Sequence, residues 1–92
     1  MEIENFIPTK YFCEVYKVDT SFVDSLKEYG LITIVVYEDT EYIEKEKLNE
    51  LEKMIRLHYD LNINMEGIEA ISHLLNKIAI LKHEINDLKS RL

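Results

Sequence analysis

Three histidines are the first candidates for chemistry in this sequence, because an imidazole can bind a metal or move a proton near neutral pH. His58 lies fifteen residues before His73, and His73 lies ten residues before His83. Ten residues along one helix place two side chains on different faces. The three imidazoles are therefore not expected to meet, and the sequence predicts no metal site.

Carboxylates and one thiol are the other candidates. Asp39 with Glu41, or Glu44 with Glu46, could form an acid–base pair, but their surroundings offer nothing to shift a carboxyl pKa. Cys13 has apolar neighbours and no catalytic motif, so we expect a buried structural thiol. The chain has only two glycines, and no glycine-rich phosphate loop. We expect a binding protein without a cofactor, not an enzyme.

Charge is the most informative property of the composition. The formal net charge is −7. Residues 1–52 hold five lysines and thirteen acids, a net of 5 − 13 = −8, whereas residues 53–92 hold six basic and five acidic residues, a net of 6 − 5 = +1. The acidic half should repel phosphate backbones and attract basic partners.

The length and the apolar pattern limit the classes to which the protein can belong. Ninety-two residues fit one small domain. A core of this size gives marginal stability, and a second copy of the chain could extend it. No stretch approaches the roughly 20 apolar residues of a membrane span. The start, Met1–Asn5, lacks the basic and apolar regions of a signal peptide. We expect a cytoplasmic protein.

Two short helices are expected after an extended segment at residues 5–8. Thr9 should cap the first, Lys10–Tyr16, through its side chain. Asp19 should cap the second, which Gly30 should end in a left-handed conformation. Apolar residues at spacings of three and four predict the inner faces. They are Phe12, Val15 and Tyr16 on the first helix, and Phe22, Val23 and Leu26 on the second, with Tyr29 close behind.

A small hairpin should follow directly. The β-branched and aromatic run Ile32–Tyr37 predicts a strand, Glu38–Thr40 a polar turn, and Glu41–Ile43 a returning strand. A third helix is expected at about Glu46–Leu61.

The last helix carries the strongest pattern. Asn62 should end the preceding helix, and Asn64 should cap the last one, which is expected from Met65 to about Leu92. Gly67 lies in its first turn, where a glycine costs little.

Leucine or isoleucine recurs along this last helix at alternating spacings of three and four, which is a heptad seam and predicts a coiled-coil homodimer. The seam residues are Ile71, Leu74, Ile78, Leu81, Ile85, Leu88 and Leu92. Ile68, Ala70, Leu75 and Ala79 widen the first half of this face, which should therefore also touch its own domain.

This order resembles that of MerR-like winged helix-turn-helix proteins. The resemblance implies a mainly α fold with two short helices, a β-hairpin wing, a third helix and a long C-terminal coiled-coil-type helix. Residues 1–61 would form the winged domain, and residues 62–92 the helix that packs on it and pairs in a dimer.

The chain also resembles the CbpM-like chaperone modulators from Thr9 to Leu92. The matching segments are Tyr11-Phe12-Cys13, Val18-Asp19, Tyr29-Gly30-Leu31-Ile32, Arg56–Asn64, Gly67-Ile68, and Leu74-Leu75, Ile78, Leu81, Glu84 and Leu88. The resemblance implies binding to the J-domain of a DnaJ-like (CbpA-type) co-chaperone, which blocks its stimulation of Hsp70 and its attachment to DNA.

DNA binding by a MerR-like transcriptional regulator is the main alternative, and a pure oligomerisation module is a weaker one. The helix after Asp19, at residues 20–29, would read the major groove, but it holds one lysine, two acids and no arginine. The hairpin tip, Glu38-Asp39-Thr40-Glu41, would bring three carboxylates to the phosphates. We therefore do not expect nucleic acid to be the partner.

The predicted partner-binding residues are five acids and two tyrosines on the second helix and the hairpin. The acids would set the association rate, and the tyrosines would be exposed anchors. The residues are Asp24, Glu28, Tyr37, Glu38, Asp39, Glu41 and Tyr42.

Overall fold

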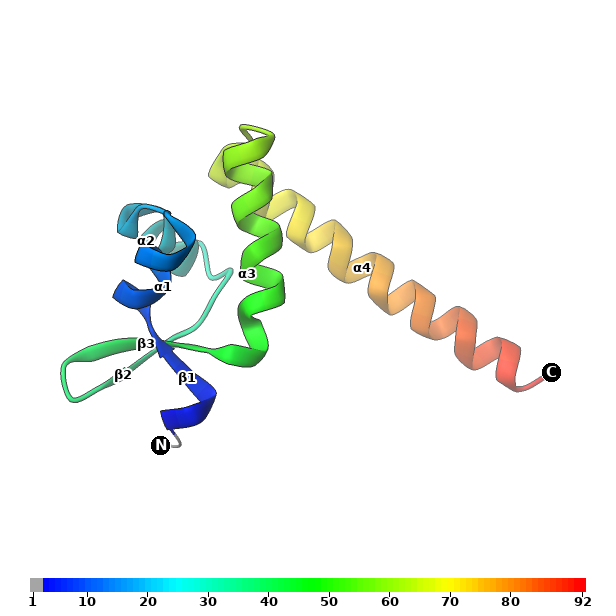
Figure 1. Cartoon of the computed structure of the whole chain (residues 1–92). Helices are drawn as coiled ribbons and strands as arrows, with labels where there is room; N and C mark the ends of the chain where they lie inside the picture. The colour runs from blue at the N-terminus through cyan, green and yellow to red at the C-terminus, as the bar shows by residue number, and fades with distance from the viewer. Residues whose placement is uncertain (1–2) are drawn as a thin grey trace.

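A computed structural model describes residues 3–92 and shows a small head from which one long helix projects (Figure 1). Helices and strands follow the expected order. The elements are β1 (Phe6–Pro8), α1 (Thr9–Tyr16), α2 (Thr20–Glu28), β2 (Ile34–Tyr37), β3 (Thr40–Glu44), α3 (Leu48–Ile55) and α4 (Met65–Ser90). The structure is therefore a winged helix-turn-helix with a long C-terminal helix, as predicted.

Helix α1 ends at Tyr16 as predicted, but it differs from its prediction at its start and in its inner face. Thr9 is its first residue, not its cap, because the N-cap is Pro8, which makes no side-chain hydrogen bond. Thr9 is buried instead. Val15 is 55 % exposed, because α1 turns Thr9, Phe12 and Cys13 toward the core.

Helix α2 forms where it was expected. Asp19 occupies the N-cap position, although its side chain makes no capping hydrogen bond. Phe22, Val23 and Leu26 are buried, as the spacing predicted. Gly30 follows the helix at φ +73°, a left-handed conformation that glycine adopts without steric cost.

The sheet has one strand more than the predicted hairpin. Its order is β1-β3-β2, and both neighbouring pairs are antiparallel. The segment predicted only as extended pairs Ile7 with Ile43, which also faces Ile34 of β2. Ile43 is consequently the buried centre of the sheet.

The hairpin turns through two residues, Glu38 and Asp39, both at positive φ (48° and 62°). Two-residue hairpins favour such turns because their twist matches that of the strands, but glycine or asparagine usually occupies them. The tip is therefore held in a conformation that its side chains disfavour.

The third helix is continuous but not uniform. A 3₁₀ turn, Lys45–Lys47, leads into α3, and a π-helical turn, Arg56–Asp60, extends it. Asn62 ends it at φ 54°, as predicted. The Ile63 amide then donates to the Leu57 carbonyl at 3.0 Å.

Helix α4 begins at the predicted cap. Asn64 Oδ1 accepts a hydrogen bond from the Gly67 amide at 2.8 Å. A Cβ atom added to Gly67 would lie 2.6 Å from Ile63 Cγ2 and 3.1 Å from Asn64 Oδ1. Glycine is therefore needed here for the close approach of the linker, and not merely tolerated.

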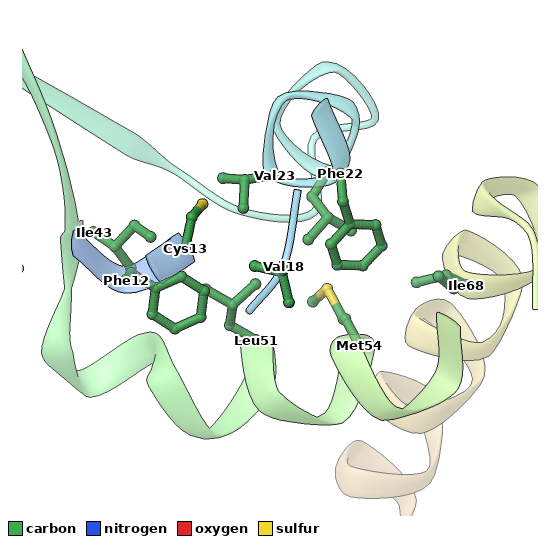
Figure 2. Packing of buried hydrophobic residues seen from close by; sticks show 10 residues of the cluster. Phe12, Cys13, Val18, Phe22, Val23, Ile43, Leu51, Met54 and Ile68 are labelled. Carbon is green, nitrogen blue, oxygen red and sulfur yellow. The ribbon is translucent and has the colours of Figure 1, made fainter. Parts of the chain in front are cut away.

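One core joins the head to α4. Figure 2 shows Ile68 of α4 directed toward Met54 of α3 and Phe22 of α2. The core residues are Phe12, Cys13, Val18, Phe22, Val23, Leu26, Ile43, Leu51, Met54 and Ile68. The first turns of α4 are thus part of the folded head, and the exposed helix begins further along.

Candidate interaction surfaces

The predicted acidic face gathers around a hollow between α1, α2 and the hairpin. Asp24 comes from α2, Asp39 from the turn and Glu41 from β3, and all three line one hollow of about 390 Å³. The start of α1 supplies Lys10, which is exposed, and Thr9. The hairpin pairing with β1 positions this arrangement, because β1 leads directly into α1.

The other predicted residues of this face lie around the hollow. Glu28 and Glu38 are exposed but do not line it. Tyr37 is 45 % exposed on β2, as expected of an anchor. Tyr42 is half-buried in β3, opposite Pro8, so it presents less surface than predicted.

The carboxylates of Asp24, Asp39 and Glu41, which line the hollow, form no ion pair with a described residue. The one ion pair within residues 3–92 joins Arg91 and Asp87 at 3.0 Å on the exposed end of α4. Of the three carboxylates that line the hollow, that of Asp24 also acts on a buried group, the Cys13 thiol. Burial raises the pKa of the Cys13 thiol, and the charges of Asp24 and Asp19 raise it further. Cys13 is buried, as predicted, and its environment opposes the thiolate that a nucleophile would need.

His58 has a packing role. Its ring stacks on Phe22 with centroids 4.6 Å apart, and Nδ1 lies 3.0 Å from the Ile63 carbonyl oxygen. Tyr59 packs edge-on against both rings, and its hydroxyl accepts a hydrogen bond from the Asp19 amide at 3.2 Å. Across the described part of the chain, no three His, Cys, Asp or Glu side chains are placed to hold a metal ion.

Two tyrosine hydroxyls brace the elements around the core. Tyr29 donates to Glu66 of α4 at 2.7 Å, which lowers the Glu66 pKa and raises the Tyr29 pKa. Tyr16 donates to Glu52 of α3 at 3.2 Å. Partial desolvation raises the Tyr16 pKa, and this hydrogen bond raises it further.

The heptad seam is the second surface, and most of it is exposed in the single chain. Ile71 is half-buried near the head. Five further seam residues are 46 to 60 % exposed: Leu74, Ile78, Leu81, Ile85 and Leu88. Leu92 lies beyond the end of α4 at Ser90, so the helical seam stops at Leu88, one position earlier than predicted.

A third surface was not identified from the sequence. Two adjoining hollows of about 360 and 380 Å³ share Lys53, Leu57 and Leu75, and they form a groove between α3 and α4. The apolar residues outside the seam in the first half of α4 were the signal for it, because Leu75 and Ala79 line the groove.

Comparison with known families accounts for this arrangement. The family model described as MerR HTH family regulatory protein matches residues 7–90. The chain belongs to this family. No curated protein and no solved structure matches it. Helix α2 is therefore the second helix of the helix-turn-helix, and β2 and β3 form its wing.

Within residues 3–92, none of the helices combines the length and the apolar character that a membrane span requires.

Proposed function

We propose that this protein is a regulator that binds the J-domain of a DnaJ-like co-chaperone and keeps it from Hsp70, without catalysing a reaction. The observation that carries the proposal is the charge of the face formed by α2 and the wing. A helix-turn-helix presents this face to its target. Here Asp24, Asp39 and Glu41 surround its hollow, and none of them has a cationic partner.

The resemblance to the CbpM-like modulators supports the choice of partner. J-domains present a basic helix, which an acidic face would attract and orient. Tight binding needs apolar anchors as well, and Tyr37 beside the tip is exposed enough to be one. A partner held on this face would be unable to offer the same basic surface to Hsp70.

Charge reversal tests the proposal. The protein should bind a J-domain protein of its host in calorimetry, and Glu38→Lys/Asp39→Lys/Glu41→Lys should slow association and remove much of its salt dependence. The matched control is Glu46→Lys/Glu50→Lys/Asp60→Lys, which changes the net charge equally at exposed sites off this face. Absence of binding to every J-domain protein refutes the partner. Equal loss in both triple variants refutes the face.

Specific DNA binding is the second candidate, and the family match favours it. The charges oppose it, because α2 and the turn carry four acids and one lysine between Thr20 and Asp39, as Asp24, Glu28, Glu38, Asp39 and Lys27. An anisotropy titration with a random duplex library decides. Sub-micromolar, sequence-dependent binding at about 150 mM salt would support the DNA-binding function, since specific readers bind at about 10⁻⁸ M or tighter.

We also propose that the protein acts as a homodimer joined through α4. The exposed seam would otherwise leave five large apolar side chains in water on a helix with few contacts to the head. Sedimentation of the wild type and of Leu81→Lys tests this. A wild type that remains monomeric at high micromolar concentration refutes the dimer.

Charges beside the seam favour an antiparallel pair in one register. If Ile78 lies opposite the partner's Leu81, the seam pairs from Ile71 to Leu88, and Lys77 meets the partner's Glu84 twice by symmetry. Sliding by one heptad in either direction juxtaposes like charges instead, as Lys77 with itself or as Glu84 with itself. A parallel pair places Lys77 against the partner's Lys82, which repels, and Glu84 against the partner's Lys89, which attracts, so its two contacts offset each other.

A further inference from the structure

We infer that the outer edge of β2 is a binding site for an extended segment of a protein partner, which would add a strand to the sheet. The segment would carry apolar side chains and a cationic residue beside the hairpin tip. The inference goes beyond the proposed function, because strand addition uses backbone groups that a basic helix would leave unbound. The site is one edge of the sheet, since the strand order is β1-β3-β2.

The pairing register shows which backbone groups of β2 are free. Tyr37 and Thr40 close the two-residue turn, and this pair is hydrogen-bonded in such hairpins. Bonded and non-bonded pairs alternate along an antiparallel ladder, so Val35 bonds to β3, whereas Ile34 and Val36 do not. The N–H and C=O groups of Ile34 and Val36 therefore point away from β3, and within residues 3–92 no other backbone hydrogen bond engages them.

The two edges of the sheet differ in their protection. Proteins usually guard an edge strand with a proline, a charge, a bulge or a very short length. The β1 edge, Phe6–Pro8, is three residues long and ends in a proline. Strand β2 contains neither a proline nor a charge, and its register with β3 runs without a bulge. Val36 is 62 % exposed, so β2 is the edge that a further strand can approach.

The side chains of β2 indicate what kind of strand fits beside it. Ile34 faces the same side of the sheet as its neighbour Ile43, and Val35 faces the other side with Tyr42. All four residues of β2 are β-branched or aromatic. Cross-strand pairs of β-branched and aromatic residues stabilise a sheet. An added strand should therefore carry such residues toward both faces.

Charge favours a cationic segment over a second copy of this chain. Glu38 and Asp39 continue β2 directly, and neither forms an ion pair with a described residue. In an antiparallel pair of two such edges, each tip would lie beside uncharged residues between positions 29 and 34 of the other chain. A parallel pair would bring the acids of both tips together. Opposite charges on neighbouring strands attract, so a lysine or arginine beside the tip suits the edge better.

Hydrogen exchange measured by NMR tests the edge directly. In the free chain, the amides of Ile34 and Val36 should exchange much faster than those of Val35 and Tyr37, which are bonded to β3. The probe is a short capped peptide of alternating valine and threonine with a lysine at each end. It should shift the amide signals of Ile34 and Val36 saturably and slow their exchange. Unchanged signals would overturn the inference, as would protection in the free chain that disappears on dilution, because a second copy would then occupy the edge.

A proline variant separates the edge from the fold. Val36→Pro removes an outward N–H but no bond to β3, so the hairpin should form and the peptide should bind about tenfold more weakly or worse. Val36→Thr keeps the N–H and the branched shape, and should bind like the wild type. Slow exchange of Val35 and Tyr37 reports an intact hairpin. Equal affinity of the two variants would overturn the inference.

Two altered peptides test the same contact without changing the protein. N-methylation of a pair of adjacent central amides blocks both edges of the peptide, so it should abolish binding, and retained binding would overturn strand addition. Glutamate in place of the lysines should weaken binding about two- to fivefold, and Glu38→Gln/Asp39→Asn should remove the difference. Equal affinity of the lysine and glutamate peptides for the wild type would overturn the cationic residue.

The outcomes for this edge and for the proposed function are distinguishable. A J-domain protein that binds the wild type and Val36→Pro equally, while the peptide does not bind, leaves the proposed function standing and overturns the edge site. Binding of the peptide without binding of any J-domain protein does the reverse.

Discussion

The substitution Lys77→Glu has opposite consequences for the two ways in which α4 could pair. In the antiparallel register it replaces attraction to the partner's Glu84 with repulsion. In a parallel pair it replaces repulsion from the partner's Lys82 with attraction. Lys77 is exposed on the described helix, so the substitution should leave the head unchanged.

The expected size of the effect follows from symmetry. An exposed helix-surface charge pair contributes about 0.3–0.5 kcal/mol, and a like-charge pair costs a similar amount. Reversal therefore changes each contact by about 0.6–1 kcal/mol, and a symmetric dimer has two such contacts. The total of about 1–2 kcal/mol corresponds to a roughly 5- to 30-fold change in the dimer Kd.

Sedimentation equilibrium measures this change directly. We expect Lys77→Glu to raise the Kd and Lys77→Glu/Glu84→Lys to restore it, and raising the salt concentration should shrink both effects. A lower Kd for Lys77→Glu would refute the antiparallel register.

Disulfide trapping checks the same geometry by distance. In the antiparallel register, Ile85→Cys lies opposite the partner's Leu74, about 16 Å along the helix from its own copy. It should not oxidise with itself, but it should cross-link to a Leu74→Cys chain. Disulfides need Cα atoms within about 7 Å, so self-cross-linking of Ile85→Cys would instead show a parallel pair. The wild type, whose Cys13 is buried, is the control.

Three further predictions concern the folded head. Gly67→Ala should lower the free energy of unfolding by about 1–2 kcal/mol in urea titrations, because the new Cβ meets Ile63, although alanine has the better helix propensity. The loss should be smaller in an Ile63→Ala background, and additive losses from the two substitutions would contradict the contact between them. Tyr29→Phe should raise the pKa of Glu66 in an NMR titration, because the hydrogen bond that lowers this pKa is removed. A lowered carboxyl pKa stabilises the fold above the unfolded pKa, so the wild type should lose this contribution as the pH falls through the folded pKa. An unchanged Glu66 pKa would contradict the contact. Cys13 should react with a thiol reagent much more slowly than a free thiol at pH 8, and urea should remove the protection; equal rates in the folded and unfolded chains would show that it is not buried.

Local signals in the sequence were enough to place most of the elements. The cap at Asn64, the left-handed residues Gly30 and Asn62, and the apolar spacing of α2 depend on neighbours within one or two turns, and the structure agrees with each. The heptad pattern of α4 is local in the same sense. These interactions need no knowledge of what the rest of the chain does.

Features that depend on distant residues were missed or misread. Thr9 looked like a cap, but pairing of β1 with β3 carries it into the interior. Gly67 looked merely tolerated, because the approach of Ile63 is set by the turn between α3 and α4. The π-helical turn at Arg56–Asp60 likewise has no simple sequence pattern.

The candidate site divides in the same way. The sequence by itself determined that the chain is acidic in its first half, has a helix-turn-helix with a charged wing, and ends in a helix with an apolar seam, because composition and periodicity are properties of the chain alone. Only the tertiary structure decided that Asp24, Asp39 and Glu41 share one hollow with Lys10 and Thr9, while Glu28 and Glu38 stay outside it. That grouping depends on how the hairpin packs beside α1 and α2, and contacts between segments far apart in the sequence are fixed by the packing of the core.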